Sequence, residues 1–169
     1  FYDNDKVIVN PLRVRSEYLS ELENNLVLYF TSTSRESATI IKEQQKNVAA
    51  KNEKSIDAMH QLKEQAKMMK DALLRGQLNE IGKILDYGFQ QKRNMAHNIS
   101  NSSIESIYEA AKAAGATGGK ISGAGGGGFM IFYCPANTRY KVMDVLKDFG
   151  GEVKPYRFTK HGLTTWTAQ

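Results

Sequence analysis

The chain has 169 residues, 41% of them hydrophobic, which is the size of one domain with one substantial core. No apolar stretch approaches the ~20 residues that a membrane-spanning helix needs, and no secretion signal is visible. The single cysteine, Cys134, excludes an intrachain disulfide framework. We predict it to be a buried apolar residue in a protein of the reducing cytoplasm.

The net charge of +5 is concentrated in one part of the chain, because Lys42 to Arg93 holds eleven Lys and Arg against seven Asp and Glu. A basic helical stretch can bind nucleic acid or a membrane surface. Within this stretch the lysines alternate with acids and glutamines, and its first aromatic residue is Tyr87. We therefore interpret the stretch as a solvated helix face and expect neither a nucleic-acid nor a membrane partner.

The first elements alternate between extended and helical patterns. Residues Val7–Val14 form a β-rich run broken by a proline, which indicates an edge strand or an extended segment. Asn25–Thr31 is predicted as a strand. Thr33 and Glu36 have capping-box spacing, so a helix is expected from there toward Gln45.

Three amphipathic helices follow, and their apolar stripes are predicted to face the core rather than a cofactor. The first ends at Gly76, and a new capping box from Ser102 to Glu105 opens the third helix, which stops near Gly115. The stripes are Ile56, Met59, Leu62, Ala66, Met69 and Leu73; then Leu78, Ile81, Leu85 and Phe89; then Ile104, Ile107, Tyr108 and Ala111.

The last third of the chain is expected to contain a hairpin, a helix and a strand. Lys120–Ser122 and Phe129–Cys134 are the predicted hairpin strands, Pro135–Phe149 the helix, and Glu152–Thr159 the final strand. From Asn25 onward the order is β-α-β-β-α-β, with extra helices in the first crossover. We therefore predict an α+β fold with a ferredoxin-like split β-α-β sheet.

A glycine-rich loop, GGKISGAGGGGF at Gly118–Phe129, lies between the hairpin strands. Successive free N–H groups in such a loop form a concave nest for phosphate oxygens, although a glycine-rich turn can also be purely structural. The loop contains G-x-G-x-x-G, but it opens a strand instead of a helix, which excludes a dinucleotide-binding unit. Ala114–Ile121 fails the P-loop pattern, because its first glycine and its hydroxyl residue are replaced.

The glycine-rich segment resembles the third signature motif of the GHMP kinases, which lies in their ferredoxin-like C-terminal domain. Within that family, several segments are most similar to the heptose 7-phosphate kinases, and the resemblance spans essentially all of residues 1–169. These segments are Val9–Arg13, Tyr29–Ser37, Ile99–Asn101 and Gly115–Pro135.

The resemblance implies that half of the kinase is absent from this chain. The family binds ATP and Mg²⁺ mainly on an N-terminal domain, through a P-x-x-x-G-L-G-S-S loop that does not occur here. We can therefore assign no catalytic residue and no metal ligand. The chain also begins at Phe1 rather than Met, so we expect a C-terminal segment that pairs with an N-terminal kinase domain and is inactive alone.

The same resemblance implies a set of site residues. The loop, comprising Gly123, Ala124, Gly125, Gly126, Gly127 and Gly128, is expected to border the transferred phosphate or the acceptor. Thr31, Ser34 and Arg35 fall where a strand gives way to a helix, and Lys120 and Ser122 precede the loop. Arg35 is the candidate for gripping a sugar phosphate through its guanidinium fork, with a salt bridge to Glu36 as the alternative. Lys120 and Ser122 point either to phosphate or to solvent.

The function implied by the resemblance is transfer of the ATP γ-phosphate to the anomeric hydroxyl of a heptose 7-phosphate. A fucokinase-like or other GHMP sugar kinase is the alternative within the family. A non-catalytic ferredoxin-like binding module is the alternative outside it. The three histidines, His60, His97 and His161, lack metal-ligand spacing and are interpreted as ordinary surface or loop residues.

Overall fold

The structure is a computed structural model that describes residues 7–33, 37–160 and 162–167. Its elements, in chain order, are α1 (Ser16–Asn25), β1 (Leu26–Phe30), α2 (Ser37–Ala49), α3 (Glu53–Arg75), α4 (Leu78–Arg93), η1 (His97–Ile99), α5 (Ser102–Ala113), β2 (Gly118–Ile121), β3 (Phe129–Tyr133), α6 (Thr138–Leu146), η2 (Lys147–Phe149) and β4 (Glu152–Lys154). Within these ranges, no helix is both long and apolar enough to cross a bilayer.

The four strands form one sheet in the order β2-β3-β1-β4, and every neighbouring pair is antiparallel. Strands β1 and β2 therefore run the same way with β3 between them, and β3 and β4 run the same way with β1 between them. This is the split β-α-β arrangement expected from the order of elements, so the predicted ferredoxin-like α+β fold is confirmed.

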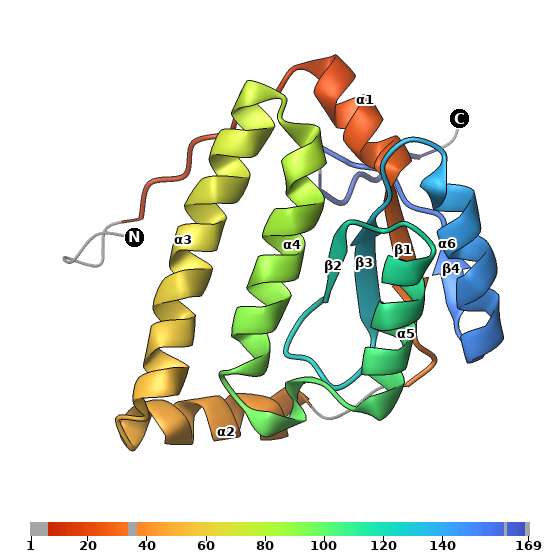
Figure 1. Cartoon of the computed structure of the whole chain (residues 1–169). Coiled ribbons are helices and arrows are strands. Elements are labelled where there is room, and N and C mark those ends of the chain that lie inside the picture. Colours follow the sequence, from red (N-terminus) through yellow and green to blue (C-terminus); the bar gives the residue numbers. More distant parts are fainter. Residues whose placement is uncertain (1–6, 34–36, 161, 168–169) are drawn as a thin grey trace.

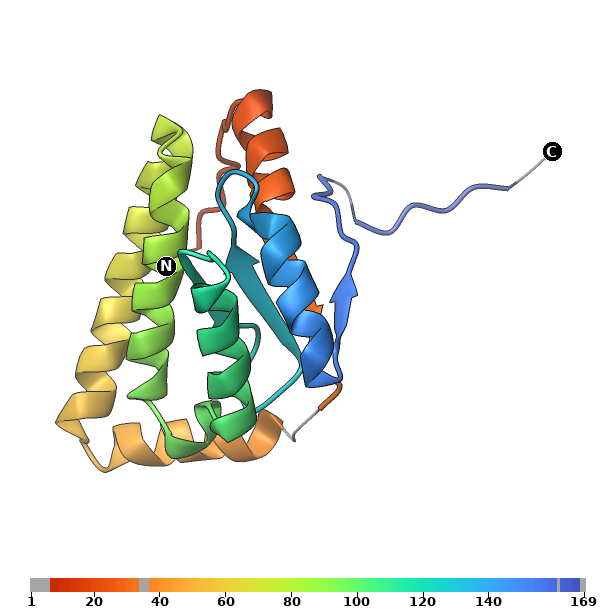
Figure 2. The same cartoon turned by 45° about the vertical axis from the view of Figure 1, so that its right-hand side comes forward.

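Helices α5 and α6 cover one face of the sheet (Figures 1 and 2). Alternate strand residues point toward them, since strand side chains have a period of two. Val27, Tyr29, Met130 and Phe132 are each at most 1% exposed. They pack in one cluster with the buried stripe of α5, namely Ile104, Ile107, Tyr108 and Ala111, as its spacing predicted.

The long helices α3 and α4 form an antiparallel pair beside the β2 edge, and α2 crosses below them (Figure 1). The cap of α3 is Asn52, whose side chain accepts a hydrogen bond from the Ser55 N–H over 3.0 Å. A second cluster joins α1, α3 and α4 to the sheet; its buried members are Leu22, Ala72, Leu78, Ile81, Ile84, Leu85 and Tyr133. The α4 stripe predicted as core is buried, whereas the predicted α3 stripe is only half-buried and its Ala66 is exposed; the buried apolar residues of α3 are Ala58 and Ala72.

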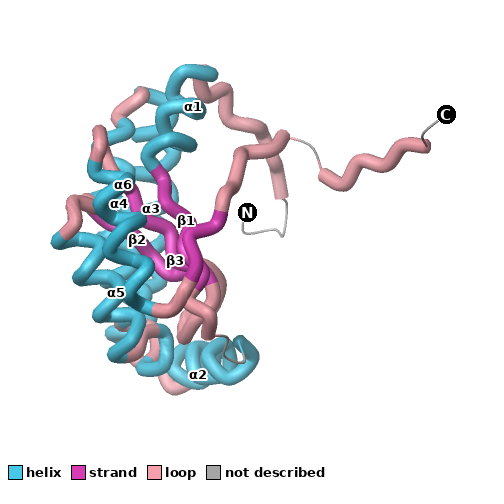
Figure 3. The backbone as a smooth tube through the Cα atoms, turned by 90° about the vertical axis from the view of Figure 1, so that its right-hand side faces the viewer, coloured by secondary structure: helices cyan, strands magenta, loops and turns pink. Residues whose placement is uncertain are grey.

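The other face of the sheet is incompletely covered. Phe30 and Phe129 are opposite each other on β1 and β3, with ring centroids 5.1 Å apart, and Phe129 is 39% exposed. Figure 3 shows α5 and α6 to one side of the strands and loops to the other, with α2 below. The part of this face around Phe30 and Phe129, called here the Phe30–Phe129 face, is therefore apolar and has no covering helix among the described residues, whereas Tyr133 at the other end of the face packs against α1 and α4.

Several boundaries differ from those expected. The sequence did not predict α1, and Val7–Val14 pairs with no strand. Asn101 rather than Ser102 caps α5, since its side chain accepts from the Ile104 N–H over 3.0 Å. The final strand ends at Lys154 instead of Thr159, and α6 begins at Thr138 after an irregular turn. Glu36 of the first capping box lies outside the described residues.

Candidate functional site

The glycine-rich loop between β2 and β3 is anchored at its middle by the segment that leads into α5. The Gly126 N–H donates to the Ile99 carbonyl over 2.8 Å. The Asn101 side-chain amide donates to the Gly126 carbonyl over 3.4 Å. The same asparagine caps α5, so the start of that helix and the loop are positioned together.

A second anchor holds the end of the loop to the end of β1. The Gly128 N–H donates to the Thr33 carbonyl over 2.7 Å, and the Thr31 N–H donates back to the Gly128 carbonyl over 2.8 Å. The Thr31 hydroxyl donates to the same Gly128 carbonyl over 3.0 Å. Thr31 is only 6% exposed, so a buried side chain holds the end of the loop in place.

Gly125 is needed at the first anchor for two reasons. Its φ is +118°, in the region that side chains rarely adopt, and an added Cβ would lie 2.7 Å from the Ile99 carbonyl oxygen. The backbone of the loop thus approaches Ile99 more closely than any other residue type allows.

The N–H groups of Gly123 and Ala124, before the first anchor, and of Gly127, between the two anchors, donate to no described residue. These three residues line a hollow of about 280 Å³, together with Ser37, Ser122 and Phe129. Ser122 is exposed there, and its N–H is held by the Phe129 carbonyl at 2.7 Å. Free N–H groups in a concave loop are suited to anionic oxygens.

A second hollow, of about 400 Å³, lies on the other side of Gly123 and Ala124, which line both. Lys92 from α4 and Lys120 from β2 line it, together with Gln44, Gln65 and Phe89. The Lys92 ammonium donates to the Gly123 carbonyl. Burial, and then the nearby charge of Lys120, lower the pKa of Lys92 to about 8.

Lys92 was missed by the sequence interpretation, which placed the basic stretch on a solvated helix face. Its only sequence signal was the excess of Lys and Arg between Lys42 and Arg93. Lys120 was predicted, and the structure places it half-buried beside this lysine.

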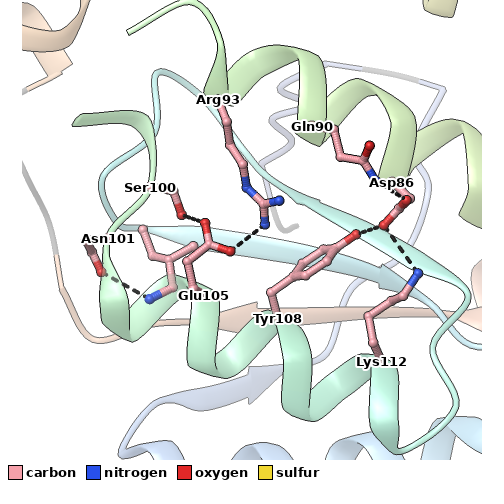
Figure 4. A network of polar contacts seen from close by, with 9 residues as sticks. Asp86, Gln90, Arg93, Ser100, Asn101, Glu105, Tyr108 and Lys112 are labelled. Carbon is pink, nitrogen blue, oxygen red and sulfur yellow. Dashed lines mark hydrogen bonds and ion pairs between the residues drawn. The ribbon is translucent and has the colours of Figure 1, made fainter. Parts of the chain in front are cut away.

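A network of hydrogen bonds and ion pairs joins α4 to α5 (Figure 4). Asp86 accepts hydrogen bonds from the Tyr108 hydroxyl, from Lys112 at 3.3 Å and from Gln90 at 2.7 Å. Burial first, and then the bond to Asp86, raise the pKa of Tyr108.

The same helix pair carries a second ion pair nearer the loop. Arg93 binds Glu105 at 2.7 Å, and Ser100 donates to the same carboxylate (Figure 4). Ile99 and Asn101, which hold the loop, therefore lie beside two helices, α4 and α5, that polar contacts join to each other.

The remaining candidates are placed as follows. Ser34 and Arg35 lie outside the described residues, so their expected contacts stay predictions. Cys134 is fully buried, as predicted, and burial raises its pKa to about 12. His60 is exposed. No group of three or more His, Cys, Asp or Glu side chains in the described ranges is arranged to hold a metal.

Comparison with known proteins shows the family to which this chain belongs. Residues 69–152 match the model of the GHMP kinases C terminal region. A D-glycero-alpha-D-manno-heptose 7-phosphate kinase from Campylobacter jejuni is 41% identical over 98% of the chain. The chain belongs to the GHMP kinases, as their C-terminal domain, which confirms the resemblance seen in the glycine-rich segment.

More distant relatives and solved structures agree with the fold. A D-glycero-D-manno-heptose 1-phosphate kinase from Bacteroides thetaiotaomicron is 30% identical over 97% of the chain, with a TM-score of 0.64. A bifunctional fucokinase/GDP-fucose pyrophosphorylase from Arabidopsis thaliana is 27% identical over 73% of it. The chain spans 48% of the Campylobacter kinase, 43% of the Bacteroides one and 12% of the plant protein.

Proposed function

We propose that this chain is the C-terminal half of an ATP-dependent kinase that phosphorylates the anomeric hydroxyl of a heptose 7-phosphate in the cytoplasm. The observation that carries the proposal is the anchored glycine loop, which has N–H groups that donate to no described residue and which lines a hollow with two lysines. Phosphoryl transfer is catalysed chiefly by positioning and charge stabilisation, and such groups supply both.

The roles of the predicted residues follow from where their polar atoms lie. The loop from Gly123 to Gly128, with Ser122, would bind oxygens of the transferred phosphate, and Thr31 would hold the loop in place. ATP and Mg²⁺ would be bound mainly by the rest of the protein. Among the described residues, N–H and ammonium groups can bind an anion, and no group of three or more His, Cys, Asp or Glu side chains is arranged to hold a metal ion.

The rest of the protein is proposed to be an N-terminal nucleotide-binding domain. Relatives roughly twice as long support this, since the chain spans 48% of the Campylobacter kinase. The Phe30–Phe129 face adjoins the glycine loop, because Phe129 lines the same hollow as Gly127 and Gly128. An apolar sheet face beside a candidate site suits a domain interface that closes over the substrate.

Heptose phosphate is favoured over fucose as the substrate because the heptose kinase matches at 41% identity and the fucokinase at 27%. A binding module without catalysis remains the third alternative.

The test is a substrate panel with the full-length protein, ATP and Mg²⁺. The proposal predicts a much higher kcat/KM for heptose 7-phosphate than for unphosphorylated heptose or fucose. Equal use of fucose would favour the fucokinase alternative, and no turnover of any sugar would favour the binding module.

A further inference from the structure

The hollow that contains Lys92 and Lys120 is separate from the one that the unpaired loop N–H groups border. The two hollows meet at Gly123 and Ala124. No Asp or Glu side chain lines the lysine hollow, and neither lysine forms an ion pair with a described carboxylate. Two ammonium groups therefore share a partly enclosed space without a counter-charge.

Holding two ammonium groups in this hollow costs free energy unless a bound anion neutralises their charge. Two like charges held close together, and partly desolvated, each disfavour the charged form of the other. The lowered pKa of Lys92 is a consequence of both effects. An anion with several oxygens would offset the repulsion and accept hydrogen bonds from both ammonium groups.

Lys92 is held in position to do this. It extends from the last turn of α4, and its ammonium donates to the Gly123 carbonyl, which leaves two N–H groups for another acceptor. Gln44 and Gln65 add amide groups to the lining, and the Gln65 side chain is itself fixed by a 2.9 Å hydrogen bond to the Ile84 carbonyl.

We propose that Lys92 and Lys120 form a phosphate-binding subsite, distinct from the glycine-loop hollow, for a phosphate group that the substrate already carries. The inference rests on the proposed function: a phosphorylated sugar brings one phosphate of its own and meets a second, transferred one. The two hollows, which share Gly123 and Ala124, would each bind one of these two phosphate groups. The same chemistry would accept a phosphate of the nucleotide, so the experiment must separate the two sources.

The experiment uses the full-length protein and the variants Lys92→Met and Lys120→Met, with Lys83→Met as the matched control. Lys83 is on the same helix, but it is largely exposed and is paired with Glu80 at 2.8 Å. We expect each hollow variant to raise KM for the phosphorylated sugar about tenfold to a hundredfold, as for a lost charge-assisted hydrogen bond. KM for the unphosphorylated sugar and for ATP should not change.

A purely structural role for Lys92 would change all three constants together or none of them, and either result would overturn the proposal. A rise in KM for ATP alone would assign the subsite to the nucleotide phosphate. Lys92→Arg should recover part of the affinity, because it keeps the charge but alters the geometry.

A second readout does not depend on turnover. In the unmodified full-length protein, the rate at which an acylating reagent labels Lys92 and Lys120 is followed by peptide mass spectrometry, with Lys83 as internal reference. Inorganic phosphate or the sugar phosphate should slow labelling of the two hollow lysines only. Protection without any kinase activity would retain the subsite and reject the proposed function. Kinase activity without protection would retain the proposed function and reject the subsite.

Discussion

The N–H group of Gly126 donates to the carbonyl oxygen of Ile99 over 2.8 Å, and this bond ties the glycine loop to the segment that leads into α5. The neighbouring Gly125 allows the approach, since its missing side chain would otherwise lie against the Ile99 backbone. The middle of the loop is therefore held against the segment before α5, whereas the N–H groups of Gly123, Ala124 and Gly127 donate to no described residue.

Gly125→Ala should lower both the melting temperature and kcat of the full-length protein. The new Cβ would lie 2.7 Å from the Ile99 carbonyl oxygen at a φ of +118°, so the anchor must shift. Gly150→Ala is the matched control outside the loop, because its φ of +70° adds strain of about 1–2 kcal/mol while nothing lies within 4 Å of the added carbon. Equal loss of stability and activity in both variants would show that contact with Ile99 is unimportant.

Tyr108→Phe should destabilise the protein by about 1–2 kcal/mol, because it removes a buried donor from Asp86. The carboxylate would keep Lys112 and Gln90, which limits the loss. Urea unfolding measures the change. Tyr140→Phe serves as the control, since Tyr140 is 72% exposed. No difference between the two variants would mean that the network in Figure 4 contributes little to joining α4 and α5.

The pKa of Lys92 predicts a pH dependence of stability. Burial and the charge of Lys120 lower it from 10.5 to about 8, so the unfolded chain binds a proton between these values that the folded protein does not. The free energy of unfolding gains from this residue as the pH rises through 8. Lys92→Met should flatten that rise.

Urea unfolding at about pH 7 and about pH 10 tests this, with Lys83→Met as the control whose slope should match the unmodified protein. Other lysines titrate in the same range, so the difference between variants, not the absolute slope, is the quantity to compare. An unchanged slope in Lys92→Met would show that its amine is as solvated as that of Lys83.

Phe129→Glu should weaken docking of the remaining half of the kinase, if the Phe30–Phe129 face is the domain interface. A charge there would be desolvated when the two halves meet. Calorimetry of the full-length variant should show two separate unfolding transitions where the unmodified protein shows one. Tyr140→Glu, on the exposed surface of α6, should leave the single transition intact. An identical trace for Phe129→Glu would place the interface elsewhere.

The sheet could be predicted because the strand runs and the order of elements are local features of the sequence. Leu26–Phe30 alternates buried and less buried side chains, β3 does so up to Phe132, and the helical stripes of α4 and α5 repeat with the helical period. The resemblance to a known family was carried by the glycine segment, which is equally local.

The parts that were missed depend on distant contacts. Helix α1 has no side-chain cap at Arg15, and it is held by packing of Leu22 against α4 and Tyr133. Lys92 looks like any lysine of a basic helix, and only the folded chain shows that it reaches a glycine 31 residues further on. Asn101 and Ser102 are both good caps by composition, so the choice between them follows from the backbone and not from residue type.

The central claim is that this chain supplies one half of a sugar kinase site. The measurement that tests it most directly is transfer of labelled γ-phosphate from ATP to heptose 7-phosphate by the full-length protein and by residues 1–169 alone. The account predicts labelled heptose bisphosphate from the full-length protein and none, above a control preparation, from the shorter chain. Transfer by residues 1–169 alone, or its absence with the full-length protein, would contradict the account.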